Sequence, residues 1–162
     1  MLTMNTETTT SEFDIEFPLA PAWFQTIRRL VSMASTQCGF SDRDAGQISM
    51  SVDEALANIL KHGYQSDCSG RVKLHVDTQI EPETRIEIQL DDETNNVDLD
   101  LIRSRDLEKI RPGGLGVHLI QTIMDESNWS IRACGGLRLV LSKTKRPLST
   151  ALHASMSENH DG

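Results

Sequence analysis

Three side chains that could take part in chemistry recur at four-residue intervals along one segment: the Glu54 carboxylate, the Asn58 carboxamide and the His62 imidazole. Residues four apart lie on the same face of an α-helix, so we expect all three side chains to share one face. A carboxylate one turn from a carboxamide suits a site that activates a hydroxyl group and holds a hydrated Mg²⁺ through an oxygen ligand. The same spacing is typical of the solvated polar face of an amphipathic helix, so spacing alone leaves both interpretations open.

A glycine-rich turn before an apolar, helix-like segment is the second chemical feature. Gly113, Gly114 and Gly116 fall within four residues, with Leu115 between the last two. Glycines let the backbone pass close to a ligand, and the free N–H groups and dipole of the helix start favour a phosphate. The alternative interpretation is a turn that only caps the helix and packs.

Apolar periodicity predicts the elements that must position these residues. Strands are predicted at 13–17, 72–76, 86–90, 130–133 and 137–141, with the last two forming a hairpin around Gly135-Gly136. Helices are predicted at 22–36, from 41 to about 62, and at 115–125, with Gly39 as a stop and Ser41 as a cap. This order predicts a two-layer α/β (α+β) sandwich, in which helices cover one face of a mixed, mostly antiparallel sheet.

The length of 162 residues suits one domain, which we expect at 12–147 between flexible tails at 1–11 and 148–162. The polar, charge-dense stretch at about 97–112 is predicted to be a lid. No apolar run reaches the roughly 20 residues of a membrane span, and the N-terminus lacks a secretion signal. These features predict a cytoplasmic protein without membrane contact. The net charge of −8 disfavours direct nucleic-acid binding, and three cysteines without a CxxC pair favour reduced thiols.

The polar helix face and the glycine-rich turn together resemble the motifs of one family in order and spacing. The segment Asp53-Glu-Ala-Leu-Ala-Asn58 resembles the N-box of the GHKL (Bergerat-fold) ATPase superfamily, and within it the bacterial anti-sigma-factor serine/threonine kinases. The segment Gly113-Gly-Leu-Gly-Val-His-Leu-Ile120 is similar to the second glycine box of that family. The resemblance covers roughly residues 13–145.

The resemblance implies a histidine-kinase-like ATPase fold and an enzyme that binds ATP and Mg²⁺. Such an enzyme phosphorylates an antagonist protein and sequesters a sigma factor, and members of the family often form homodimers. Glu54 would be the general base that takes the proton from the partner's serine, and Asn58 would be the Mg²⁺ ligand. Asp92 would hydrogen-bond the adenine amino group, unless a bulge shifts this role to Asp91. The implied nucleotide-binding set also includes Gly113, Gly114, Leu115, Gly116 and His62, for which a structural role is the alternative.

The sequence departs from the family pattern at two positions beside the adenine. Thr94 stands where the family has glycine two residues after the aspartate, and Leu137 stands where it commonly has threonine. A Cβ atom where the ligand passes closely predicts weaker nucleotide binding. A non-catalytic partner-switching regulator is therefore an alternative function. A detached histidine-kinase ATPase module is a further alternative, disfavoured because the chain shows no phosphoacceptor region.

Overall fold

Alternating apolar and polar residues build a five-stranded sheet in the part of the chain that the computed structural model describes, residues 9–94 and 115–145. The strands are β1 (Thr10–Pro18), β2 (Arg71–Gln79), β3 (Arg85–Asp92), β4 (Glu126–Ile131) and β5 (Leu137–Thr144). They lie in the order β1-β2-β3-β5-β4, and all four pairings are antiparallel. The predicted fold class is confirmed, with no parallel pair among the described strands.

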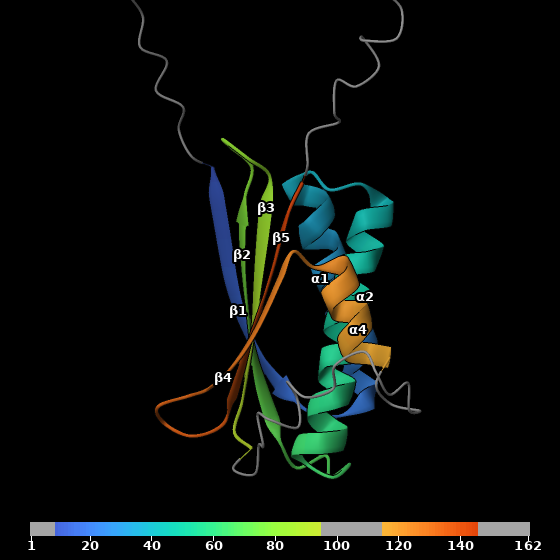
Figure 1. The fold of residues 1–162 in the computed structure, drawn as a ribbon, viewed down its shortest axis with the longest axis vertical. Helices are drawn as coiled ribbons and strands as arrows, with labels where there is room; N and C mark the ends of the chain where they lie inside the picture. The colour runs from blue at the N-terminus through green and yellow to red at the C-terminus, as the bar shows by residue number, and fades with distance from the viewer. Residues whose placement is uncertain (1–8, 95–114, 146–162) are drawn as a thin grey trace, which may run out of the picture.

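One face of this sheet is covered by the described α-helices, α1 (Pro21–Cys38), α2 (Asp42–Asn58) and α4 (Leu115–Ile123) (Figure 1). Both α1 and α4 pack against α2, which places α2 in the middle of the helical layer. A short π-helical turn, η1 (Ile59–Gly63), continues α2. The central helix of this layer therefore carries the predicted carboxylate and carboxamide, Glu54 and Asn58.

The core lies between the two layers, because the strands turn their apolar residues toward the helices. Alternate residues of the three central strands are fully or almost fully buried: Val72, Leu74, Val76, Ile86, Ile88, Leu90, Leu139 and Leu141. They pack in one cluster with buried helix residues such as Ile48, Val52 and Leu56. The core is aliphatic, as the low aromatic content of 4% leads one to expect.

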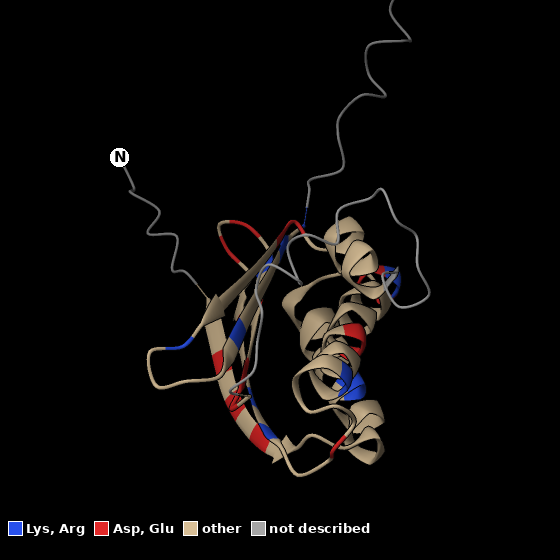
Figure 2. Ribbon diagram, turned by 60° about the horizontal axis from the view of Figure 1, so that its bottom comes forward, with Lys and Arg blue, Asp and Glu red and all other residues tan. Residues whose placement is uncertain are grey.

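The opposite face of the sheet is polar, and charged residues recur along the strands (Figure 2). Cross-strand neighbours form ion pairs there, including Lys73 with Asp14 at 3.3 Å and Arg71 with Glu16. Exposed pairs of this kind add little to stability, so this face is mainly a solvated surface. All three cysteines are free thiols. None of the described helices is long and apolar enough to cross a membrane.

Two of the predicted helix boundaries are confirmed by their caps. Gly39 ends α1 with a left-handed φ of 108°, a conformation that favours glycine. Ser41 begins α2, where its Oγ accepts a hydrogen bond of 3.1 Å from the Asp44 N–H.

Other predicted boundaries are wrong. β1 begins at Thr10, so the last two residues of the predicted N-terminal tail belong to a strand. β4 begins at Glu126, four residues before the predicted start, and α4 ends at Ile123. Residues 126–129 lack apolar alternation, and their pairing with β5 is a long-range effect. The helical segment that begins at Asp42 does end at Gly63, close to the predicted residue 62, but its last turn is π-helical: the Tyr64 N–H donates to the Ile59 carbonyl five residues back at 3.3 Å.

Candidate nucleotide site

The start of α4 lies directly against the polar face of α2. A Cβ atom added at Gly116 would be 2.5 Å from Oε2 of Glu54 and 3.3 Å from Nδ2 of Asn58. A side chain at Gly116 would therefore require the Glu54 carboxylate to move from this position. The fold thus brings together the two features that the sequence singled out separately.

The carboxamide of Asn58 is half-buried, and its Nδ2 atom has no hydrogen-bond partner among the described residues. A buried amide group without a hydrogen-bond partner costs free energy, so the unpaired Asn58 amide indicates that an external group supplies the missing partner. Rotation of the amide by 180° exchanges its oxygen and nitrogen, and the oxygen is a ligand type that Mg²⁺ accepts. No cluster of acidic, histidine or cysteine side chains in the described part of the chain can hold a metal by itself.

Asp92 ends β3 on the helix-facing side of the sheet, opposite Val72, and its side chain is fully buried. Its Oδ1 atom accepts hydrogen bonds from the backbone N–H groups of Thr94 at 2.7 Å and Leu137 at 3.3 Å. Its Oδ2 atom has no hydrogen-bond partner among the described residues. Burial raises the pKa of Asp92, and the two backbone hydrogen bonds offset this only in part. The unpaired oxygen suits a ligand amino group as its donor.

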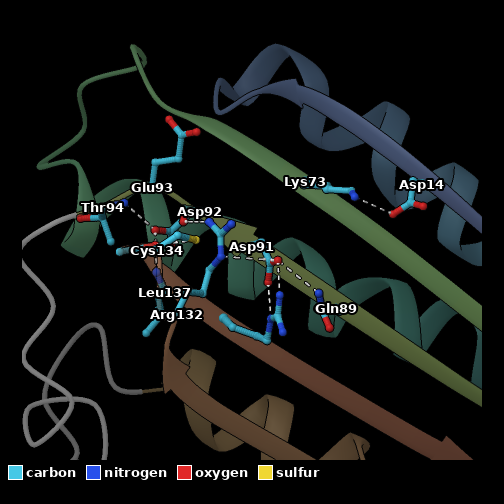
Figure 3. A network of polar contacts seen from close by, with 12 residues as sticks. Asp14, Lys73, Gln89, Asp91, Asp92, Glu93, Thr94, Arg132, Cys134 and Leu137 are labelled. Carbon is cyan, nitrogen blue, oxygen red and sulfur yellow. Dashed lines mark hydrogen bonds and ion pairs between the residues drawn. The ribbon is translucent and has the colours of Figure 1, made fainter.

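Asp91, the neighbouring carboxylate, faces the other side of the sheet (Figure 3). It accepts two hydrogen bonds of 2.7 Å from Arg138, its cross-strand neighbour on β5. Burial alone raises the pKa of Asp91, but the hydrogen bonds and charge of Arg138, together with Arg132, lower it overall. No bulge interrupts the β2–β3 pairing, so Asp92 rather than Asp91 faces the helical layer.

Hydrogen bonds connect the end of the helix that carries Asn58 with the end of the strand that carries Asp92. Thr94 donates a hydrogen bond of 2.9 Å from its Oγ1 atom to the Gly63 carbonyl. The Tyr64 hydroxyl accepts one of 3.1 Å from the Glu93 N–H. These contacts tie the ends of α2 and β3 together, so the two halves of the site are held by one connected frame.

The two departures from the family pattern fit this frame without backbone strain. Thr94 is buried and does not adopt a positive φ; the only described non-glycine residues that do are Gln65 and Ser66. Its side chain packs on Gly63, where an added Cβ would lie 3.3 Å from Thr94 Oγ1. Leu137 contributes its backbone N–H to Asp92, but its buried side chain has no hydroxyl to add.

Several predicted site residues are not brought together by the described structure. Gly113, Gly114 and the predicted lid at about 97–112 lie outside the described residues. Leu115 is the first residue of α4, and His62 is exposed within the π turn. The predicted position of the glycine turn beside α2 is therefore supported by Gly116 alone.

Two residues of the β4–β5 turn contact Asp92, and of these the sequence did not predict the role of Arg132. Arg132 donates a hydrogen bond of 2.8 Å from Nη1 to the Asp92 carbonyl. Gly136 has a φ of +87°, and a Cβ there would overlap the same carbonyl oxygen. The resemblance placed the start of the last strand beside the adenine, but no local pattern signalled the contact of Arg132 with Asp92, because it spans 40 residues of chain.

Known proteins share this architecture. The family model of the histidine kinase-like ATPase domain matches residues 17–143. The serine-protein kinase RsbW of Bacillus subtilis is 26% identical over 121 residues, covering 70% of this chain and 74% of that protein. RsbW of Oceanobacillus iheyensis is 27% identical over 138 residues, covering 80% and 84%.

The structure of the RsbU and RsbW domains of Rv1364c from Mycobacterium tuberculosis superposes with a TM-score of 0.56 at 16% identity. The superposition covers 85% of this chain and 33% of that one, and it supports the fold alone. The family model, by contrast, spans the described elements from the end of β1 to β5, including α2, the end of β3 and the start of α4. This chain belongs to the histidine kinase-like ATPase domain family.

Proposed function

We propose that the chain is an ATP- and Mg²⁺-dependent protein serine kinase of the anti-sigma-factor type. In this role it phosphorylates an antagonist protein, sequesters a sigma factor and switches between these two partners. The observation that carries the proposal is the contact of Gly116 with Glu54 and Asn58, because it joins a carboxylate, a carboxamide and a helix start. The relatives named serine-protein kinase RsbW support the reaction class.

Each of the three polar side chains has a separate role in this reaction. Glu54 is the general base that accepts the proton of the partner's serine hydroxyl. Asn58 offers its amide oxygen to Mg²⁺, and Asp92 accepts a hydrogen bond from the adenine amino group at its unpaired Oδ2 atom. When bound, ATP would supply its γ-phosphoryl group to the serine oxygen and leave as ADP, and Mg²⁺ would neutralise the charge of the phosphates.

The backbone around α4 receives the phosphates. The first N–H groups of a helix have no partner within the helix, and the dipole places positive charge there. Leu115 and Gly116 begin this nine-residue helix. We assign Gly113 and Gly114 to the same phosphate turn, the stretch at about 97–112 to a lid over it, and His62 to its surroundings.

We further propose that the protein acts in the cytoplasm, contacts neither membrane nor nucleic acid directly, and can form a homodimer. The net charge of −8 supports the second point, since phosphate backbones repel an acidic protein.

A non-catalytic partner-switching regulator is the second candidate function. It is favoured by Thr94 and Leu137, which replace the family's glycine and threonine beside Asp92. A threonine side chain packed on Gly63 fills space, and leucine adds no polar contact for the adenine. In this candidate function the chain keeps the surfaces that bind its partner proteins but binds nucleotide weakly.

Phosphoryl transfer tests the proposal. Purified protein is incubated with Mg²⁺, ATP labelled at the γ-phosphate and candidate antagonist proteins of the same organism, and label on serine is measured. We expect transfer by the wild type and a loss of roughly a hundredfold or more for Glu54→Gln, the scale of general-base catalysis. The matched control is Asp53→Asn, because Asp53 pairs with Arg28 on α1 at 3.3 Å instead. Equal rates for Glu54→Gln and the wild type would exclude the base role; the absence of both ATP binding and transfer to any candidate would favour the regulator.

A further inference from the structure

The β4–β5 turn packs on the backbone of Asp92. The turn is closed by hydrogen bonds from the Arg132 N–H to the Gly136 carbonyl at 2.9 Å and from the Gly135 N–H to the Arg132 carbonyl at 3.0 Å. Gly135 and Gly136 both have a φ of +87°. Because a Cβ at Gly136 would overlap the Asp92 carbonyl oxygen, the turn backbone must lie in direct contact with the end of β3.

The guanidinium group of Arg132 connects two adjacent residues of that strand end (Figure 3). Its Nη1 atom donates to the Asp92 carbonyl at 2.8 Å. Its Nε atom makes no hydrogen bond with the described residues but lies 3.6 Å from Oδ2 of Asp91, so the attraction there is one of charge. Asp91 is itself fixed by Arg138 and by Gln89 Nε2 at 3.2 Å. The carboxylate of Asp91 therefore attracts the Arg132 guanidinium group, which in turn donates to the main-chain carbonyl of Asp92.

The position of the Asp92 carboxylate depends on this arrangement. Its Oδ1 atom is bonded to the Leu137 N–H, the first residue of β5 after the turn. Arg132 lies at the other end of the same turn. It donates to the Asp92 carbonyl at the end of β3 and, through its N–H, to the Gly136 carbonyl just before β5, so it ties these two chain ends together. A shift between these two chain ends would move the Oδ2 atom, which has no hydrogen bond to the described residues that would restrain it.

We propose that Arg132, anchored on Asp91, is a positioning residue that aims Asp92 at the amino group of an adenine nucleotide. The inference rests on the proposed nucleotide binding. It assigns specificity for the 6-amino group to a side chain on the far side of the sheet from the helices. If Arg132 only stabilised the hairpin, its loss would weaken the binding of all nucleotides by the same factor.

The test compares ATP with purine riboside triphosphate, which lacks the 6-amino group. Dissociation constants for both nucleotides with Mg²⁺ are measured for the wild type, Asp92→Asn, Arg132→Gln, Arg132→Lys and the double variant Asp92→Asn/Arg132→Gln. We expect the wild type to prefer ATP by about tenfold or more, the scale of one charge-assisted hydrogen bond. Asp92→Asn abolishes this preference. Arg132→Gln reduces it about threefold or more, and Arg132→Lys restores part of it, because lysine keeps the charge but not the fork of donors.

The double variant and a distant arginine serve as controls. Because Arg132 acts through Asp92, the preference of the double variant for ATP over purine riboside triphosphate equals that of Asp92→Asn alone. Arg85→Gln removes an arginine at the opposite end of β3, where Arg85 pairs with Glu87 at 2.9 Å, and it keeps the wild-type preference. Thermal unfolding of each variant confirms that the compared proteins are folded.

The outcomes separate this inference from the proposed function. A wild type that binds and prefers ATP, with an unchanged preference in Arg132→Gln, overturns the positioning role while nucleotide binding stands. Equal weakening for both nucleotides in Arg132→Gln also overturns it. A wild type that binds neither nucleotide overturns the proposed function, and the inference with it.

Discussion

Gly116 at the start of α4 lies against Glu54 on α2, because a Cβ at Gly116 would be 2.5 Å from Oε2 of Glu54 and would force that carboxylate to move. The contact joins residues that are 62 positions apart in the chain, and it fixes the distance between a carboxylate and a helix start. For a phosphoryl transfer site this distance is the central requirement, since catalysis in such sites depends mainly on positioning and charge.

Gly116→Ala should separate activity from stability. The atom that the new methyl group meets is the end of a flexible glutamate side chain, which can rotate away, and alanine favours the helix. We expect the free energy of unfolding to change by less than about 1 kcal/mol. Phosphoryl transfer should fall roughly a hundredfold, the effect of a misplaced catalytic group.

The matched control is Gly46→Ala in α2, where an added Cβ meets nothing within 4 Å. It should raise the free energy of unfolding by about 0.5–1 kcal/mol through helix propensity and leave transfer unchanged. Chemical denaturation and the transfer assay measure both quantities. Full activity in Gly116→Ala would show that Glu54 does not act from this position.

Gly136→Ala should destabilise the fold more than Gly39→Ala. Both glycines have a positive φ, +87° and +108°, so alanine costs about 1–2 kcal/mol at each for this reason. At Gly39 the nearest atom to the new Cβ is 3.7 Å away, whereas at Gly136 the Cβ overlaps the Asp92 carbonyl oxygen. We therefore expect at least about 1 kcal/mol of additional loss at Gly136, measured from denaturant midpoints. Equal losses would contradict the close packing of the turn on β3.

Asp91→Ala should lower the free energy of unfolding by about 1–2 kcal/mol, because it removes a buried acceptor of several hydrogen bonds. The exposed pair of Arg85 and Glu87 provides the comparison, and Glu87→Ala should cost at most about 0.5 kcal/mol.

The contribution of Asp91 also depends on pH. Arg138 and Arg132 lower its folded pKa below the ordinary value of 3.8, against the opposing effect of burial. Its stabilising effect is present above 3.8 and is lost as pH falls through the lowered pKa. Urea denaturation from pH 7 to pH 3 should show the cost of Asp91→Ala shrinking at the acid end; a constant cost would show that charge plays no part.

Asp92→Asn should raise the free energy of unfolding at neutral pH. Burial raises the folded pKa of Asp92, so the folded protein binds its proton more tightly than the unfolded chain does. Stability from this group is complete below 3.8 and is lost as pH rises through the raised pKa. The gain from Asp92→Asn should therefore be largest at pH 7 and shrink toward pH 4. A gain that does not change with pH would contradict an unpaired buried carboxylate.

Local patterns predicted those parts of the fold that local physics determines. The alternation of Ile86, Ile88 and Leu90 predicted β3 and its buried face, and Ser41 with Asp44 predicted the start of α2. The four-residue spacing of Glu54 and Asn58 placed them on one helix face, and both lie beside Gly116. In each case neighbours within a few residues supply the cause.

The remaining features depend on pairing across the chain. The ion pairs of Asp91 follow from the register of β3 with β5, 47 residues apart at Arg138, and no local pattern encodes that register. The contact of Arg132 with Asp92 has the same origin. β4 was predicted too late because its residues at 126–129 gain their partners only from β5.

Calorimetric titration with ATP in the presence of Mg²⁺, for the wild type and for Asn58→Ala, tests the central claim most directly. Asn58 has a buried amide nitrogen without a described partner, so the substitution removes the proposed ligand and leaves no charge behind. We expect saturable binding by the wild type and affinity at least about tenfold lower for a folded Asn58→Ala protein. The absence of wild-type binding at millimolar ATP, or equal affinities for the two proteins, would contradict it.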